Sequence, residues 1–235
     1  MAAFADLHIQ PRVDDDHAAR TMAELLGIAG YSLIGLTIPT GLMETRVSSL
    51  RRAFEEVGIE PLLRADLAPR SRDELLRLLR RYRSRFELIA VRCVNAAAAS
   101  VASRDSRVDI LFFDPSSRNT RFTHTYASLL RGALEFNLIT NLRNAVTETY
   151  LRVAKEAAIS RRRKTKVVLS SGATSPEEVR SPLQLSALGK AIGLSNDQSL
   201  RGVSEIPAAI AHRSLERRSG SYIEEGVRII PRAAR

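Results

Sequence analysis

The sequence is poor in residues on which several common classes of protein depend. Among its 235 residues there is one cysteine, Cys93, there is no tryptophan, and aromatic residues make up only 5%. A single cysteine excludes an internal disulfide and a cysteine-based zinc site, and it is typical of a reducing compartment. Proteins that bind single-stranded bases by stacking usually carry more aromatic residues, interleaved with basic ones. The composition therefore argues against a stacking platform.

Long apolar runs are also missing. No stretch approaches the roughly 18 consecutive apolar residues that a membrane-spanning helix needs. Residues 1–10 lack the basic region and apolar run of a secretory signal, so we expect a cytoplasmic protein. Apolar residues still make up 44% of the chain, which is enough for a sizeable buried core.

Acidic residues are scarcer than basic ones. The chain has 36 Lys and Arg residues against 26 Asp and Glu residues, and its net charge is +10. This excess points to a polyanionic partner, most simply nucleic acid. Most of the positive charge is arginine, which forms forked contacts with phosphate and stacks on bases, so RNA is favoured. A basic surface without a specific ligand stays open as the alternative.

Short apolar runs alternate with helical patterns along most of the chain. Strands are predicted over residues 3–9, 31–38, 59–67, 86–91, 108–113, 134–139 and 166–170. Helices are predicted over residues 17–29, 45–57, 71–82, 96–103, 125–132 and 142–160, and only helices follow, up to about residue 217. Repeated strand–helix units imply a parallel sheet with right-handed crossovers, and this many favour a distorted, TIM-like (β/α) barrel.

The predicted barrel leaves two questions of organisation. We expect a single domain over residues 1–218 and a loosely attached tail over residues 219–235. An eighth strand is either absent or hidden near residues 201–205. No GxGxxG motif follows the first strand, so a dinucleotide-binding fold loses its main support.

Asp6 and His8 lie at the end of the first predicted strand, on the rim where barrels build their sites. The pair weakly resembles the His-x-His of metal-dependent phosphoesterases of the polymerase-and-histidinol-phosphatase type. That family needs further ligands, and the only other histidines are His17, His124 and His212. We therefore expect no metal site and interpret Asp6 and His8 as polar rim residues.

Four more polar residues, Asp66, Arg92, Asp114 and Asn137, fall at or near predicted strand ends. A carboxylate cluster at these ends could carry out acid–base chemistry. Polar residues that simply close the barrel mouth explain the same pattern, and we favour this interpretation.

Two basic segments are candidates for phosphate contact, one over residues 70–85 and one over residues 161–166. Clustered arginines repel one another, and phosphates would relieve that repulsion and release counterions. The alternatives are the solvated face of an amphipathic helix for the first segment and a solvated loop for the second. The candidates are Arg72, Arg80, Arg81, Arg83, Arg161, Arg162, Arg163, Lys164 and Lys166, together with Arg118 and Arg121 after the fifth predicted strand.

Small residues close the seventh predicted strand, in the order Ser170, Ser171, Gly172, Ala173. Such residues let backbone N–H groups approach a phosphate, although a plain turn explains them equally well. An Arg-x-Pro follows at 180–182, and then a Leu-Gly helix that ends in Gly-Leu-Ser at 188–195.

Together these three motifs resemble the signature of ribonuclease P component 3, the thirty-kilodalton subunit family of archaea and eukaryotes. Weaker matches are Arg143-Asn144-Ala145 at the start of the long helix, Asp6-Leu7 in the first strand and Gly30-Tyr31 at the second. The resemblance covers about residues 3–217 and is strongest over residues 134–213.

The resemblance implies a distorted barrel related to the phosphoesterase barrels but without their metal site. It implies a protein that binds the catalytic RNA, pairs with component 2 and works with other holoenzyme subunits on precursor tRNA, whose 5′ leader the complex removes. The RNA supplies the chemistry, so the protein has no catalytic site or cofactor, and Mg²⁺ is expected only with the RNA. Arg143, Ser170, Ser171 and Arg180 join the RNA-binding candidates. A phosphoesterase on the same barrel, or a protein-interaction scaffold, are the alternatives.

Overall fold

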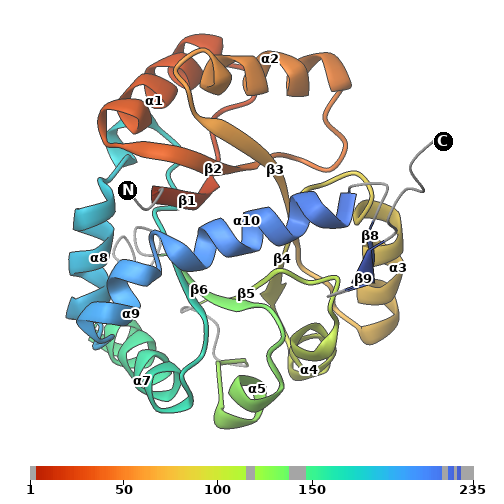
Figure 1. Ribbon diagram of the computed structural model, residues 1–235. Coiled ribbons are helices and arrows are strands. Elements are labelled where there is room, and N and C mark those ends of the chain that lie inside the picture. Colours follow the sequence, from red (N-terminus) through yellow and green to blue (C-terminus); the bar gives the residue numbers. More distant parts are fainter. Residues whose placement is uncertain (1–3, 115–119, 138–146, 219–221, 225–226, 229–235) are drawn as a thin grey trace, which may run out of the picture.

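The computed structural model describes residues 4–114, 120–137, 147–218, 222–224 and 227–228. Seven parallel strands pair in the order in which they follow along the chain, and helices surround them (Figure 1). The strands are β1 (Phe4–Ile9), β2 (Tyr31–Thr37), β3 (Glu60–Leu67), β4 (Leu88–Cys93), β5 (Ile110–Phe113), β6 (Ala133–Asn137) and β7 (Val167–Ser170). The helices are α1 (Asp16–Ile28), α2 (Glu44–Glu55), α3 (Arg72–Tyr82), α4 (Ala96–Arg104), α5 (His124–Leu129), α7 (Thr147–Arg163), α8 (Pro182–Ala191), α9 (Asn196–Arg201) and α10 (Glu205–Arg218), with a 3-10 turn, η1 (Pro176–Glu178).

The strands curve into a nearly closed barrel, which confirms the predicted TIM-like architecture. At the carboxyl ends of the strands, a parallel bridge between Ile9 and Ala173 joins β1 to the segment that follows β7. The backbone N–H of Gln10 also donates a hydrogen bond to the carbonyl of Ala173, at 2.8 Å. The seam between the first and last strands is therefore closed at this end.

At the amino ends, the same seam is filled by a turn. The carbonyls of Gly202 and Val203 accept hydrogen bonds from the backbone of Leu169 in β7, at 2.9 Å, and of Ala5 in β1, at 3.0 Å. Since α9 ends and α10 begins on either side of this turn, the alternative of a short eighth strand near residues 201–205 is wrong. The turn therefore bridges β7 and β1 through two carbonyls, at the place where an eighth strand would lie.

The lower interior of the barrel is apolar. Inward-facing side chains from all seven strands form one buried cluster: Ala5, Leu7, Leu33, Leu62, Leu88, Ala90, Ile110, Ala133 and Val168. Ile210 and Ala211 of α10 belong to the same cluster, because α10 crosses the amino-terminal end of the barrel (Figure 1). A second, larger cluster packs the outer faces of the strands against the surrounding helices.

Helix α10 is also held by a buried carboxylate. Asp109, directly before β5, is fully buried and forms ion pairs with Arg217 of α10, at 3.0 Å, and with Arg83 after α3. A third guanidinium, of Arg213, lies 3.8 Å away. The same carboxylate accepts a hydrogen bond from the backbone N–H of Ile89, so it ties the helix to the neighbouring strand.

A neighbouring carboxylate, Glu87, extends this network. It accepts a hydrogen bond from the backbone N–H of Leu63 and pairs with Arg51, at 2.7 Å, and with Arg218 of α10, at 3.6 Å. The hydroxyl of Ser214 donates to the carbonyl of Glu87. The amino-terminal end of the barrel is thus closed by a helix whose arginines meet two acids of the barrel.

Several predicted boundaries differ from the structure. The helix expected over residues 125–132 ends at Leu129, because Leu130 is extended and the backbone N–H of Arg131 donates to the carbonyl of Ser103, at 3.0 Å, instead of continuing the helix. The fourth strand begins at Leu88 rather than at residue 86 and extends to Cys93. Parts of the strand expected over 134–139 and of the helix expected over 142–160 lie outside the described residues.

The basic run at residues 161–166 is not a loop alone, which corrects the expected boundary. Helix α7 continues to Arg163, so Arg161, Arg162 and Arg163 form its last turn. Cations at a helix carboxyl end are favoured by the helix dipole, which explains why like charges are tolerated at that position. In the predicted tail, β8 (Tyr222–Glu224) and β9 (Val227–Arg228) pair antiparallel. That the tail is separate from the domain stays a prediction.

Candidate functional site

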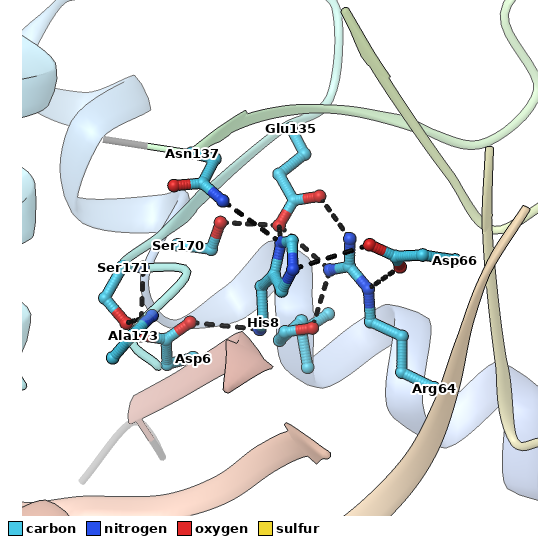
Figure 2. Close-up of polar contacts among 10 residues, drawn as sticks. Asp6, His8, Arg64, Asp66, Glu135, Asn137, Ser170, Ser171 and Ala173 are labelled. Atoms are coloured by element: carbon cyan, nitrogen blue, oxygen red, sulfur yellow. Dashed lines mark hydrogen bonds and ion pairs between the residues drawn. The ribbon is translucent and has the colours of Figure 1, made fainter. Parts of the chain in front are cut away.

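Polar side chains line the upper interior of the barrel, at the carboxyl ends of the strands (Figure 2). Because alternate residues of a strand point to the same face, the apolar layer formed by Leu62, Ala133 and Val168 is followed, two residues on, by charged or polar residues. The residues of this mouth cluster are Asp6, His8, Arg64, Asp66, Glu135, Asn137, Ser170 and Ser171.

Arg64 and Glu135 form the centre of the mouth cluster. The side chains of both are fully buried, and two parallel hydrogen bonds join them, from Nη1 to Oε1 at 2.9 Å and from Nη2 to Oε2 at 2.6 Å. Arg64 also donates through Nε to Asp66, at 2.6 Å, and through Nη1 to the carbonyl of Leu7, at 2.7 Å. A forked, charge-assisted pair of this kind fixes both geometry and charge.

The pKa directions agree with a charged pair. Burial by itself would raise the pKa of Glu135, but the Arg64 guanidinium and His8 outweigh it and hold that pKa well below its usual range. Burial would lower the pKa of Arg64, but Asp66 and Glu135 raise it instead. Arginine therefore stays protonated and the carboxylate ionised inside the barrel.

His8 bridges the two carboxylates of the mouth cluster. Its Nδ1 lies 3.2 Å from Oε1 of Glu135, and its Nε2 lies 3.4 Å from Oδ2 of Asp66. The side-chain amide of Asn137 lies 3.3 Å from the same Nδ1, and the ring of Phe112 packs against the imidazole at 6.0 Å between centroids. His8 is therefore a buried member of an internal network at the barrel mouth.

The small residues after β7 close the cluster from the other side. Ser170 donates its hydroxyl to Glu135, and the backbone N–H of Ser171 donates to Asp6, at 3.0 Å. Gly172 has a φ of 66°, a left-handed conformation that favours glycine, and a side chain there would displace the amide of Asn137, which lies 2.1 Å from the position of its Cβ. Both serines are fully buried. Their role as RNA contacts stays a prediction, and neither side chain is exposed to solvent in this structure.

Asp6 differs from Glu135 in having no arginine partner among the described residues. Burial raises the pKa of Asp6 to about 6, against hydrogen bonds from Ser171 and from the backbone N–H of His8 that lower it. The carboxyl therefore changes protonation state in mildly acidic solution.

Arg64 and Glu135 were missed by sequence reasoning, which considered strand ends only. The sequence did contain a signal for both residues. Arg64 lies two residues before Asp66, and Glu135 lies two residues before Asn137, and each follows an inward-facing apolar residue by two positions. Such a spacing places two polar side chains on the same inner face of one strand. Of the other strand-end candidates, Asp66 and Asn137 join the cluster, Arg92 is exposed, and Asp114 is half-buried at the end of β5.

The chemistry open to the mouth cluster is limited by its own ion pairs. The guanidinium of Arg64 lies between Glu135 and Asp66, so a positive charge already occupies the place between the two carboxylates where a metal ion would bind. Within residues 4–114, 120–137 and the other described segments, no group of three or more His, Cys, Asp or Glu side chains is suited to hold a metal ion. This geometry gives the phosphoesterase alternative no support.

The predicted RNA-binding residues on α3 are exposed, apart from Arg83. Arg72, Arg80 and Arg81 project from the helix, and the guanidinium of Arg81 lies over the ring of Tyr82, at 5.4 Å. Arg83, in contrast, donates to Asp109, to Ser214 and to backbone carbonyls, so its donors are used inside the protein.

The second set of basic candidates lies around the end of α7. Arg161, Arg162, Arg163, Lys164 and Lys166 are all exposed. Figure 1 shows α7 and α3 on different sides of the barrel, so the two basic segments form separate surfaces.

The remaining candidates are scattered. Arg121 is exposed, whereas Arg180 is half-buried and donates to the carbonyls of Glu177 and Val179. Arg118 and Arg143 lie outside the described residues.

Fold and site together define a (β/α) barrel whose mouth, the usual place of a barrel enzyme's site, is filled by an internal ion-pair network. The family model described as RNase P subunit p30 matches residues 3–219. The chain therefore belongs to the RNase P subunit p30 family.

Individual relatives agree with the family match. Ribonuclease P protein component 3 of Methanococcoides burtonii is 25% identical, over 97% of this chain and 94% of the relative. The protein of the same name from Methanosarcina acetivorans is 24% identical, over 97% and 95% of the two chains.

Solved structures share the fold. A chain in the cryo-EM structure of archaeal ribonuclease P with mature tRNA superposes with a TM-score of 0.81 and 16% identity, over 98% of this chain and all of that one. A putative prolidase from Bifidobacterium longum superposes less well, with a TM-score of 0.53 and 10% identity, over 91% and 70% of the two chains. Over the described part of the chain, every helix is too short or too polar to cross a membrane.

Proposed function

We propose that this chain is a non-catalytic protein subunit of ribonuclease P that binds the catalytic RNA and supports removal of the 5′ leader from precursor tRNA. The family match over residues 3–219 supports the assignment to this enzyme. The fully buried pair of Arg64 and Glu135 carries the non-catalytic part of the proposal, because it engages the central carboxylate of the barrel mouth in an internal ion pair.

The proposed partners follow from the same assignment. The chain pairs with component 2 and with other holoenzyme subunits, and the precursor tRNA is the substrate of the whole complex. The catalytic RNA supplies the chemistry and binds the Mg²⁺ that the reaction needs. The protein contributes positive charge, of which it has a net excess of +10.

The proposed RNA contacts are the basic candidates whose side chains are exposed. On α3 these are Arg72, Arg80 and Arg81, and around the end of α7 they are Arg161, Arg162, Arg163, Lys164 and Lys166, with Arg121 in addition. Exposed arginines at these places can exchange their hydration and counterions for phosphates. The internal hydrogen bonds that Arg161 makes to the carbonyl of Gly193, at 3.4 Å, and Arg163 to Nδ1 of His124, at 3.5 Å, are long.

Reconstitution tests the proposal. The protein, with component 2, is added to its cognate ribonuclease P RNA, and cleavage of precursor tRNA is assayed at low Mg²⁺ concentration. We expect cleavage to rise only when both proteins are present. If the protein neither binds that RNA nor changes its activity, the proposal is wrong.

Charge variants locate the contact. Replacing Arg161, Arg162 and Arg163 together by Gln should flatten the slope of log affinity for the RNA against log salt by about 2 to 3, which corresponds to three lost phosphate contacts. The matched control replaces Arg20, Arg52 and Arg104, which are also exposed, and should change the slope little. Equal effects of the two triple variants would reject the assignment of this surface.

A further inference from the structure

A basic hollow lies at the amino end of β7, where α7 ends and α9 and α10 begin. Its volume is about 320 Å³, within the range of pockets that hold small ligands. Among the residues that line it are Arg161, Lys164, Thr165, Lys166, Gln198 and Arg201. Lys166 precedes β7 in the chain, so the hollow opens at the end of the barrel opposite to the mouth cluster.

The hollow carries more positive charge than its own acids can balance. Four cations line it, against one carboxylate, that of Asp197. Arg201 is paired with Asp197, at 3.5 Å, and with Glu205, at 2.8 Å. Arg161, Lys164 and Lys166 are left without an acidic partner among the described residues, so the lining attracts an anion.

Lys164 adopts a backbone conformation that normally belongs to glycine. Its φ is 51°, and it has the only positive φ of a non-glycine residue in the described chain. It ends α7 in this left-handed conformation, with the backbone N–H of Thr165 bonded to the carbonyl of Ser160 at 3.0 Å. Glycine would fill this position at lower conformational cost, so Lys164 is the residue of the hollow at which glycine can replace the side chain without strain.

Uncharged polar groups lie beside the cations of the hollow. The hydroxyl oxygen of Thr165 is buried and has no hydrogen-bond partner among the described residues. The side-chain amide of Gln198 uses its oxygen to accept a long hydrogen bond from the backbone of Ser195, at 3.5 Å, which leaves its N–H donors available. Cations and uncharged hydrogen-bonding groups are thus combined in one small space.

We infer that this hollow binds one unpaired nucleotide of an RNA strand. The phosphate lies against Arg161, Lys164 and Lys166, and the base reaches Gln198. A concave site of this size admits a group that has left the helical stack, and unpaired bases are recognised through hydrogen bonds to their edges. Because aromatic residues are few, this recognition uses charge and hydrogen bonds instead of stacking. The inference rests on the proposed function as an RNA-binding subunit.

Binding of short RNAs to the full-length protein tests the inference. A fluorescent single-stranded RNA and a blunt duplex with the same number of phosphates are titrated by anisotropy. We expect Lys164→Gly to weaken binding of the single strand by about tenfold, the loss expected for one charge-assisted hydrogen bond. The same variant should melt at the same or a higher temperature than the parent protein, because glycine relieves the left-handed strain.

Two further variants separate the hollow from general charge. Lys155→Gln removes an exposed lysine of the same helix outside the hollow and should leave single-strand binding nearly unchanged. Gln198→Met keeps size and charge, and should weaken binding of the single strand by about threefold with no effect on the duplex. If Lys155→Gln weakens binding as much as Lys164→Gly, or if duplex binding falls in parallel, the inference is overturned.

The outcome is separable from that of the reconstitution. If Lys164→Gly binds the single strand as tightly as the parent protein and the reconstitution succeeds, the nucleotide site is rejected and the proposed function stands. Weakened single-strand binding without any effect of the protein on ribonuclease P RNA would keep the nucleotide site and reject the proposed function.

Discussion

The two ends of the barrel are both closed by buried ion pairs, but they differ in where the partners come from. At the carboxyl ends of the strands, Glu135 is paired with Arg64, and both side chains belong to barrel strands and have no exposed surface. At the amino ends, Asp109 is paired with Arg83 and Arg217, whose side chains keep 16% and 14% of their surface exposed. The first network fills the barrel, and the second attaches a helix to it.

This difference predicts unequal tolerance of substitutions. A guanidinium that reaches solvent can be rehydrated when its partner is lost, whereas a fully buried one cannot. Changes at the mouth cluster should therefore affect the whole domain, and changes under α10 should act locally.

The largest effect is expected for Glu135→Gln. This change leaves the Arg64 charge buried with one carboxylate partner fewer, which should lower the free energy of unfolding by about 3–5 kcal/mol. Urea denaturation followed by circular dichroism measures it. The double variant Arg64→Met/Glu135→Met removes both charges, and its free energy of unfolding should fall clearly less than that of the single variant. A single variant within about 1 kcal/mol of the parent would contradict the importance of the pair.

The next effect concerns Asp6 and depends on pH. Its folded pKa, raised by burial to about 6, lies above the ordinary 3.8, so the unfolded chain releases this proton first. The contribution of the protonated Asp6 carboxyl to the free energy of unfolding is complete below about pH 4 and is lost as the pH rises to about 6. Relative to Asp6→Asn, the parent should lose about 2–3 kcal/mol between about pH 4 and pH 7.

Urea titrations of the parent and of Asp6→Asn at a series of pH values check this expectation. Taking the difference between the two proteins cancels the contributions of other groups, including the opposite trend from Glu135. A difference that does not vary with pH would show that the Asp6 carboxyl has an ordinary pKa.

A smaller and local effect is expected for Asp109→Asn. The amide oxygen can still accept the hydrogen bond from Ile89, but the negative charge that holds Arg83 and Arg217 is lost. We expect a loss of about 2 kcal/mol. Hydrogen exchange should accelerate in α10 more than in the strands, because the helix can detach first. Uniform acceleration over the whole barrel would remove the distinction between the two ends.

The smallest effect is expected for Arg218→Ala at the end of α10. Its guanidinium lies 3.6 Å from Glu87 and donates to the carbonyl of Ser84 at 2.9 Å, and the side chain is 37% exposed. Partly exposed ion pairs contribute little, so the loss should stay below about 1 kcal/mol by thermal or urea denaturation. A larger loss would mean that α10 depends on this rim pair as much as on Asp109.

Much of the fold followed from local pattern. The apolar strands and amphipathic helices are close to their predicted positions because a half-buried helix needs a period of about 3.6 residues and a buried strand needs a short apolar run. Helix boundaries were less predictable. The chain leaves α5 where the backbone N–H of Arg131 donates to the carbonyl of Ser103, and these residues are distant in sequence.

The candidate site was predictable in part. Asp6, His8, Asp66 and Asn137 were recognised as polar residues at the barrel mouth, and all four join the cluster. Arg64 escaped notice because a charged residue inside a strand has meaning only once its partner, 71 residues away, is known. The RNA contacts stay predictions, since exposure alone does not select among many arginines.

The sequence by itself determined the class of fold, the excess of positive charge and the family signature after the seventh strand, because periodicity, composition and short motifs are local properties of the chain. Only the tertiary structure decided that Ser170 and Ser171 face the interior, that Arg83 forms an internal ion pair with Asp109 and that Lys164 lines a hollow. Each of these outcomes depends on which distant side chain lies within hydrogen-bond distance, and that is set by the closure of the barrel.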